Sequence, residues 1–181
     1  MALQPFNSEF TTLVASWASS AQEVGLLSGR EEFPFPADLL TNWRKIADDI
    51  KAYLFFDGLT PVGYGELWLD DEEDEVELAR IIVAPEFRGK GIGTAFVQAL
   101  LVPALDAGYS DVFLRVRPDN EPAIRTYLRV GFQPVDETLA AEWNQPQPIN
   151  YTWLQYPATP KGPALGEEHA SVNDPVWVGE E

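Results

Sequence analysis

The sequence contains no cysteine and only one histidine, His169. Without cysteine, a disulfide framework and a thiol nucleophile of the chain's own are both excluded. A single histidine also excludes a histidine-rich metal site, and we expect no metal. No apolar run approaches the ~20 residues of a membrane-spanning helix, and no basic-then-apolar stretch at the N-terminus indicates a signal peptide. We therefore expect a cytoplasmic protein with no membrane partner.

Basic side chains are scarce, because 12 Lys and Arg stand against 29 Asp and Glu, for a net charge of −17. This balance disfavours nucleic acid and anionic membranes as partners. It suits a cationic substrate, but solubility is the plainer explanation of the charge. The acidic run at 70–75 is typical of a solvated loop, and a part in attracting an amine stays open.

What the chain does have is a glycine-rich segment, Arg88-Gly89-Lys90-Gly91-Ile92-Gly93, between an apolar run at 78–83 and an amphipathic run at 94–105. The order predicts a strand, a turn and a helix. Glycines leave backbone N–H groups uncovered, and a helix N-terminus adds partial positive charge. With the charges of Arg88 and Lys90 beside it, the segment predicts a phosphate or pyrophosphate site. Its glycine spacing fits neither the P-loop nor the dinucleotide pattern.

A second segment, at 111–132, predicts a strand, a turn and a helix that ends in glycine. Asn120 is placed to cap this helix, and Pro122 lies early in it, where its missing N–H does no harm. Gly131 is placed to end the helix in a left-handed conformation. The string is Arg117-x-x-Asn120-x-x-Ala123-x-x-x-Tyr127-x-x-x-Gly131-Phe132.

In this order and at this distance, the two segments resemble the GNAT N-acetyltransferase superfamily, which binds acetyl-CoA. The resemblance covers roughly residues 1–156, and its specific motifs lie between 76 and 132. It implies an α/β fold with a mixed, mostly antiparallel central sheet flanked by helices, the acyl-CoA N-acyltransferase fold. From Pro157 the composition becomes rich in proline and glycine, so we expect a tail at 157–181, disordered or docked.

The pattern along the chain predicts alternating strands and helices. The predicted strands are 3–6, 52–56, 61–69, 76–83, 112–116, 132–138 and 149–155, and the predicted helices are 8–17, 22–27, 37–45, 94–105 and 121–129. Pro103 is expected to kink or shorten the fourth of these helices.

The resemblance also implies roles for individual residues. Glu77 takes the position of a glutamate general base, and Tyr127 that of a tyrosine that protonates the departing thiolate. The backbone N–H of Val83 is expected to polarise the acetyl carbonyl. The cofactor-binding positions are Ile81, Ile82, Val83, Arg88, Gly89, Lys90, Gly91, Ile92, Gly93, Thr94, Asn120, Ala123 and Tyr127. The residues alone leave Glu77 open as one more exposed acid, and Tyr127 as a core side chain.

The expected activity is transfer of acetyl from acetyl-CoA directly to a primary amine of a small cationic acceptor. The alternatives are a peptide or protein N-terminal acetyltransferase and a non-catalytic acyl-CoA sensor. Ribosomal-protein acetyltransferases of the superfamily carry glutamate where this chain has Arg115, which disfavours that acceptor. The aromatic residues Trp17, Phe33, Phe35 and Trp43 are candidates for an acceptor pocket or for the core. A homodimer is possible.

Overall fold

The computed structural model describes residues 1–30, 32–46 and 48–157, so all but the first residue of the predicted tail lies outside the described residues. The strands are β1 (Ala2–Pro5), β2 (Ile50–Asp57), β3 (Thr60–Asp70), β4 (Glu75–Val83), β5 (Asp111–Val116), β6 (Gln133–Pro134) and β7 (Thr152–Tyr156). The helices are α1 (Thr11–Ser16), α2 (Ala21–Ser28), α3 (Ala37–Ile46), α4 (Ile92–Asp106), α5 (Glu121–Val130) and α6 (Glu137–Asn144), with short 3₁₀ turns η1 (Ser8–Phe10) and η2 (Pro85–Phe87).

The strands form one seven-stranded sheet in the order β1-β2-β3-β4-β5-β7-β6. The pair β4 and β5 is parallel, and the other pairs are antiparallel. The prediction of a mixed, mostly antiparallel sheet flanked by helices is therefore confirmed. None of the helices in the described part is long and apolar enough to cross a membrane.

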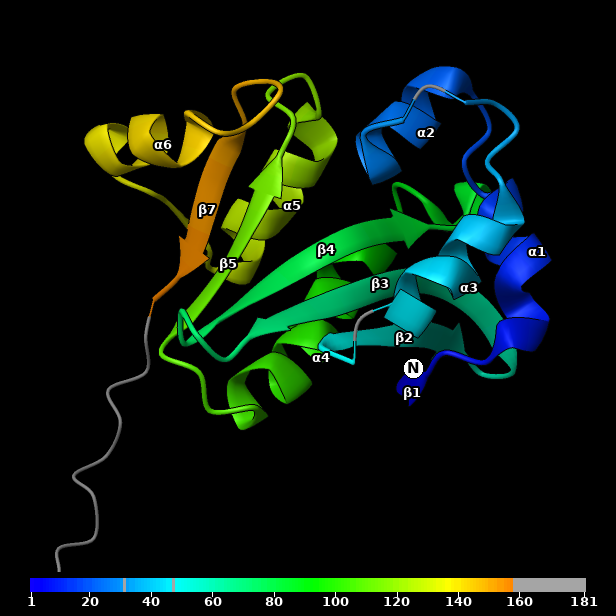
Figure 1. Cartoon of the computed structure of the whole chain (residues 1–181). Helices are drawn as coiled ribbons and strands as arrows, with labels where there is room; N and C mark the ends of the chain where they lie inside the picture. Colours follow the sequence, from blue (N-terminus) through cyan, green and yellow to red (C-terminus); the bar gives the residue numbers. More distant parts are fainter. Residues whose placement is uncertain (31, 47, 158–181) are drawn as a thin grey trace, which may run out of the picture.

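The strands β4 and β5 pair at one end only. Residues 75–77 pair with 111–113, and beyond Glu77 the two strands point apart (Figure 1). The outer edge of β4 stays paired with β3 as far as Val83, and β5 stays paired with β7. The sheet is thus intact on both sides of an opening that begins next to Glu77.

An irregularity in β4 changes which face its residues present. The pairing of β3 with β4 shifts register between Tyr64 and Glu66, and Arg80 opposite has a φ of 47°. Such a bulge re-aims the side chains that follow it. Leu78 before the bulge packs in the core beneath α4, whereas Ile82 beyond it packs in a second core with residues of α1–α3.

Two glycines of β3, Gly63 and Gly65, allow α4 to lie close against the sheet. A Cβ added at Gly63 would meet ring atoms of Phe96 at 2.8 and 3.0 Å. That ring is fully buried and stacks on Phe55, so it has no room to move away. Gly63 is therefore required by packing.

We expect Gly63→Ala to lower the free energy of unfolding by about 1–3 kcal/mol, the usual cost of overpacking a core. Urea denaturation followed by circular dichroism measures this change. Gly25→Ala is the matched control, because an added Cβ there meets the Arg30 carbonyl oxygen at an ordinary 3.7 Å. Equal stability of the two variants would contradict this account of the helix–sheet contact.

The prediction for residues 132–138 was wrong. The predicted strand at 132–138 is reduced to the two residues Gln133–Pro134, and Thr138 belongs to α6, which was not predicted. The Asp136 side chain accepts from the Thr138 N–H and caps α6, so a helix start signal was present. Of the two effects expected of Pro103, shortening is not seen, because α4 continues to Asp106, and a kink stays a prediction.

Candidate active site

A cavity of about 530 Å³ lies beside the diverging end of β4. Its volume is in the range of small-molecule sites. Its residues come from α2, the end of β4, the glycine-rich loop with the start of α4, and α5. They are Glu23, Leu26, Leu27, Ile81, Ile82, Val83, Arg88, Gly89, Gly91, Gly93, Thr94, Val97, Asn120, Pro122, Ala123, Arg125, Thr126, Tyr127 and Arg129. Segments far apart in the sequence thus meet around one space.

The glycine-rich loop has the backbone that its sequence predicts. Gly89 and Gly91 have φ values of 72° and 82°, in the left-handed region that favours glycine. Gly91 is also the N-cap residue of α4. A Cβ added at Gly89 or Gly91 would meet nothing within 4 Å, so the loop is uncovered there. Uncovered backbone at a helix N-terminus is suited to an anion.

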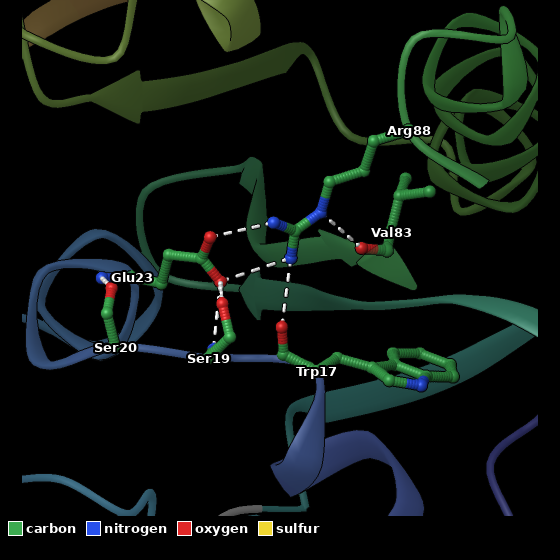
Figure 2. Close-up of polar contacts among 6 residues, drawn as sticks. All are labelled: Trp17, Ser19, Ser20, Glu23, Val83 and Arg88. Atoms are coloured by element: carbon green, nitrogen blue, oxygen red, sulfur yellow. Dashed lines mark hydrogen bonds and ion pairs between the residues drawn. The ribbon is translucent and has the colours of Figure 1, made fainter. Parts of the chain in front are cut away.

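The charged groups of the two basic residues of the loop are bound by other groups of the protein. The Arg88 guanidinium binds Glu23 of α2 and two backbone carbonyls (Figure 2). The Lys90 ammonium donates to the carbonyl of Glu86 at 2.8 Å and lies 5.6 Å from the centre of the Phe87 ring. Lys90 is not part of the cavity lining. Arg88 itself belongs to the lining, and a part for it in binding the cofactor stays a prediction.

Positive charge also reaches the cavity from α5. Arg125 and Arg129 both belong to its lining. Arg125 also binds Glu121 one turn earlier at 3.0 Å. Sequence reasoning missed this pair, although their spacing of four residues places both on one face of a helix. Ala123 and Tyr127 lie on another face of α5, because residues two apart do not share a helix face, and they too belong to the cavity lining.

The other predicted cofactor residues divide into two groups. The side chain of Ile92 is buried in the core beneath α4 and is not in the lining. Thr94, Asn120 and Ala123 lie in the lining, as do the β4 positions 81–83. The Asn120 side chain also accepts from the Ala123 N–H at 3.4 Å, which confirms its predicted role as a helix cap.

Tyr127 lines the cavity and is buried, with its ring edge-on to Phe132 at 6.1 Å between centroids. Burial raises the pKa of the Tyr127 phenol above its ordinary value. Its proton is therefore retained at neutral pH, which a general acid requires. The side chain both packs in the core and reaches the cavity, so the two interpretations of the sequence are compatible.

Glu77 lies at the vertex where β4 and β5 separate, and it is not part of the cavity lining. Its carboxylate forms an ion pair with the Arg115 guanidinium at 2.9 Å. Burial raises the pKa of Glu77 to about 7, and Arg115 partly opposes this shift. Glu77 is therefore not an ordinary exposed acid.

Arg115 is held among aromatic rings. Its guanidinium carbon lies 5.9 Å from the ring centre of Trp68 and 5.6 Å from those of Tyr151 and Trp153. Its NH1 group donates to the Gln147 side chain at 2.9 Å. The residue that departs from the ribosomal-protein enzymes therefore serves here as the partner of Glu77.

A second ion pair, between Glu66 and Arg80, joins β3 and β4. Glu66 is fully buried and accepts from Arg80 and from the Trp68 indole, each at 2.7 Å, and from the Tyr64 hydroxyl. The Arg80 guanidinium carbon lies 4.6 Å from the Trp68 ring centre. Sequence reasoning missed this network, because it depends on the register of β3 against β4.

The aromatic residues named as acceptor-pocket candidates do not line the cavity in the described part. Trp17 and Phe35 are buried in the second core, and Phe33 is 54% exposed. The side chain of Trp43 lies outside the described residues. For Trp17 and Phe35, core packing is the role that the structure supports.

Comparisons with known proteins agree with this arrangement. An uncharacterized N-acetyltransferase of Bacillus subtilis (strain 168) is 40% identical over 60 residues, which are 33% of this chain and 24% of that protein. The chain therefore spans about a quarter of the length of this relative.

Solved structures share the fold at low identity. The spermidine N-acetyltransferase of Vibrio cholerae in complex with CoA and spermine has a TM-score of 0.63 at 20% identity, with 75% of this chain and 82% of that chain covered. An aminoglycoside acetyltransferase in complex with coenzyme A and kanamycin has a TM-score of 0.62 at 18% identity, with 74% and 84% covered.

A family model decides the assignment. The model for the acetyltransferase (GNAT) family matches residues 14–132, which include the glycine-rich loop, β4, β5 and α5. These are the segments that form most of the cavity. The chain belongs to the acetyltransferase (GNAT) family.

Proposed function

We propose that this protein transfers the acetyl group of acetyl-CoA directly to a primary amine of a small cationic acceptor. The observation that carries the proposal is the cavity itself, with uncovered glycine backbone at a helix N-terminus beside a strand whose neighbour diverges. Two proteins of the same fold whose structures hold CoA also hold the amines spermine and kanamycin.

In this proposal, different residues of the cavity bind different parts of CoA. The backbone of 89–94 binds the pyrophosphate, and Arg125 and Arg129 add positive charge from α5. The pantetheine arm lies along 81–83 of β4, near Asn120 and Ala123. The Val83 N–H donates to the acetyl oxygen, where negative charge develops as the amine attacks.

The chemistry needs a base and an acid. The acceptor ammonium must lose a proton before its nitrogen can attack the thioester carbon. Because Glu77 lies outside the lining, the proton passes to its carboxylate through water. When the C–S bond breaks, the Tyr127 phenol donates its proton to the CoA thiolate. The nitrogen loses a second proton as the amide forms, and this proton restores the phenol. The products are the N-acetylated amine and CoA.

An amine panel tests the proposal. Spermidine, kanamycin, free amino acids and a short peptide with a free N-terminus are each mixed with acetyl-CoA, and released thiol and acetylated product are measured. We expect turnover with a polycationic small amine above the rate without acceptor. Turnover of the peptide alone would instead favour an N-terminal acetyltransferase. CoA binding without turnover of any acceptor would favour a sensor.

The glycine-rich loop gives a binding prediction. Gly91→Val should weaken CoA binding at least about tenfold, or about 1.4 kcal/mol, because the side chain occupies the anion position. Gly108→Val is the matched control, since Gly91 and Gly108 share a φ of 82° and open surroundings, and Gly108 is not in the cavity lining. Calorimetry on both variants measures the difference, and equal losses would contradict the predicted phosphate position.

A further inference from the structure

Arg88 leaves the glycine-rich loop and ends against α2 (Figure 2). Its NH1 and NH2 groups bind the two carboxylate oxygens of Glu23 at 2.8 and 3.2 Å. NH2 also donates to the Trp17 carbonyl at 2.9 Å, and Nε donates to the Val83 carbonyl at 2.9 Å. One guanidinium thus joins the end of β4, the residue after α1 and the first turn of α2. Only the planar fork of arginine matches several acceptors in this way.

Glu23 is fixed from its own side as well. Ser20 is the N-cap of α2, and its hydroxyl accepts from the Glu23 N–H at 3.2 Å. The Glu23 carboxylate in turn accepts from the Ser19 N–H at 2.9 Å. This is a variant of the capping box, in which side chains satisfy free donors at a helix start. The hydrogen bond from Arg88 lowers the pKa of Glu23, so the carboxylate is charged at neutral pH.

The contact joins two walls of the cavity. Glu23, Leu26 and Leu27 place one face of α2 in the lining. Val83 contributes to the lining from β4, and its carbonyl is the one that Arg88 binds. The peptide bond between Val83 and Ala84 is also held through its N–H, because the Ala84 N–H donates to the Val62 carbonyl at 2.9 Å. The end of β4 is therefore held from both sides, and α2 is tied to it.

We infer that Glu23 and Arg88 are positioning residues that form a clamp, which holds α2 in place as a wall of the CoA cavity. The inference rests on the proposed function, because CoA is taken as the occupant. Because α2 is already held in place before CoA binds, binding does not have to order this helix. The entropic cost of ordering it is therefore not subtracted from the affinity. Arg88 then acts through α2 and β4, and it is not a ligand of the cofactor phosphates.

Two single variants separate the clamp from a phosphate ligand, with CoA as the probe and calorimetry as the readout. Glu23→Gln removes the acceptor charge, and Arg88→Lys keeps the positive charge but loses the fork. The clamp predicts that both weaken CoA binding by a similar factor, about fivefold. A phosphate-ligand role predicts that Arg88→Lys retains affinity and that Glu23→Gln retains or improves it, because the freed guanidinium could then turn to the phosphate.

A double variant makes the test quantitative. Partners in one contact are not additive, so Glu23→Gln with Arg88→Lys should bind CoA no more weakly than either single variant. Amide exchange over 21–28 should be equally faster in all three. Glu32→Gln is the control, because it breaks an exposed Arg–Glu pair with N and O atoms 4.0 Å apart in the same third of the chain. It should leave CoA affinity unchanged.

The outcomes distinguish this inference from the proposed function. A wild-type chain that does not bind CoA overturns the proposed function itself. A wild-type chain that binds CoA, with Glu23→Gln at wild-type affinity, overturns the clamp alone. Additive losses in the double variant also overturn it, because two independent contacts with CoA would then explain the single effects.

Discussion

Glu77→Gln should lower turnover about a hundredfold, because the amide keeps the shape of the side chain but cannot accept the proton of the acceptor ammonium. In the wild-type enzyme, turnover should rise with pH through about 7, since the pKa of Glu77 is raised to about 7 and only the deprotonated carboxylate is a base. The acid limb should disappear in Glu77→Gln. Steady-state rates between pH 5.5 and 9, within about one to two units of that pKa, measure both effects.

Two control variants sharpen this prediction. Glu75→Gln removes an acid from the same strand, whose pKa burial also raises. It should keep the acid limb but move it to lower pH, because the Glu75 charge helps to raise the pKa of Glu77. Arg115→Gln removes the charge that opposes the shift at Glu77, so its acid limb should move to higher pH. If Glu77→Gln retained wild-type turnover over the whole pH range, Glu77 would not be the base.

The raised pKa of Glu77 also affects stability, with a defined sign. The folded chain holds this proton more tightly than the unfolded chain, in which the ordinary value of 4.5 applies. The contribution of Glu77 to the free energy of unfolding is therefore largest at low pH, and it falls as the pH rises from about 4.5 to about 7. Activity and stability should thus respond to this group in opposite directions.

Tyr127→Phe should lower the catalytic constant about a hundredfold and leave the affinity for CoA nearly unchanged. The phenol proton is needed when the thiolate departs, so its loss is felt in the transition state and not in cofactor binding. Pre-steady-state and calorimetric measurements on one preparation separate the two quantities.

Tyr156→Phe is the matched control for Tyr127. Both tyrosines lie edge-on to Phe132, with ring centroids 6.1 and 5.4 Å away. Tyr156 is not in the cavity lining, so its hydroxyl has no part in the proposed chemistry. Normal turnover in both variants would assign Tyr127 to packing alone.

The sequence predicted those parts of the site that depend on local backbone. The strand, glycine turn and helix around Gly91, and the cap and stop of α5 at Asn120 and Gly131, were predicted because short-range conformation decides them. Each is confirmed with the φ or hydrogen bond that its residue type requires.

What the sequence did not predict depends on contacts between distant segments. The partner of Arg88 lies 65 residues away, and nothing near Arg88 indicates that its charge turns toward α2. The pairing of Glu77 with Arg115 likewise follows from the place where β4 and β5 separate. Some local signals were present but not used, such as Ser20-x-x-Glu23 at the start of α2 and Asp136 before α6.

Amide hydrogen exchange with and without CoA tests the central claim most directly, because it reports both binding and its location. The account predicts that CoA protects the amides of 89–94 and of 120–129, and leaves those at the far end of α4, near Gly108, unchanged. No protection at saturating CoA, or protection confined to segments outside the cavity lining, would contradict it.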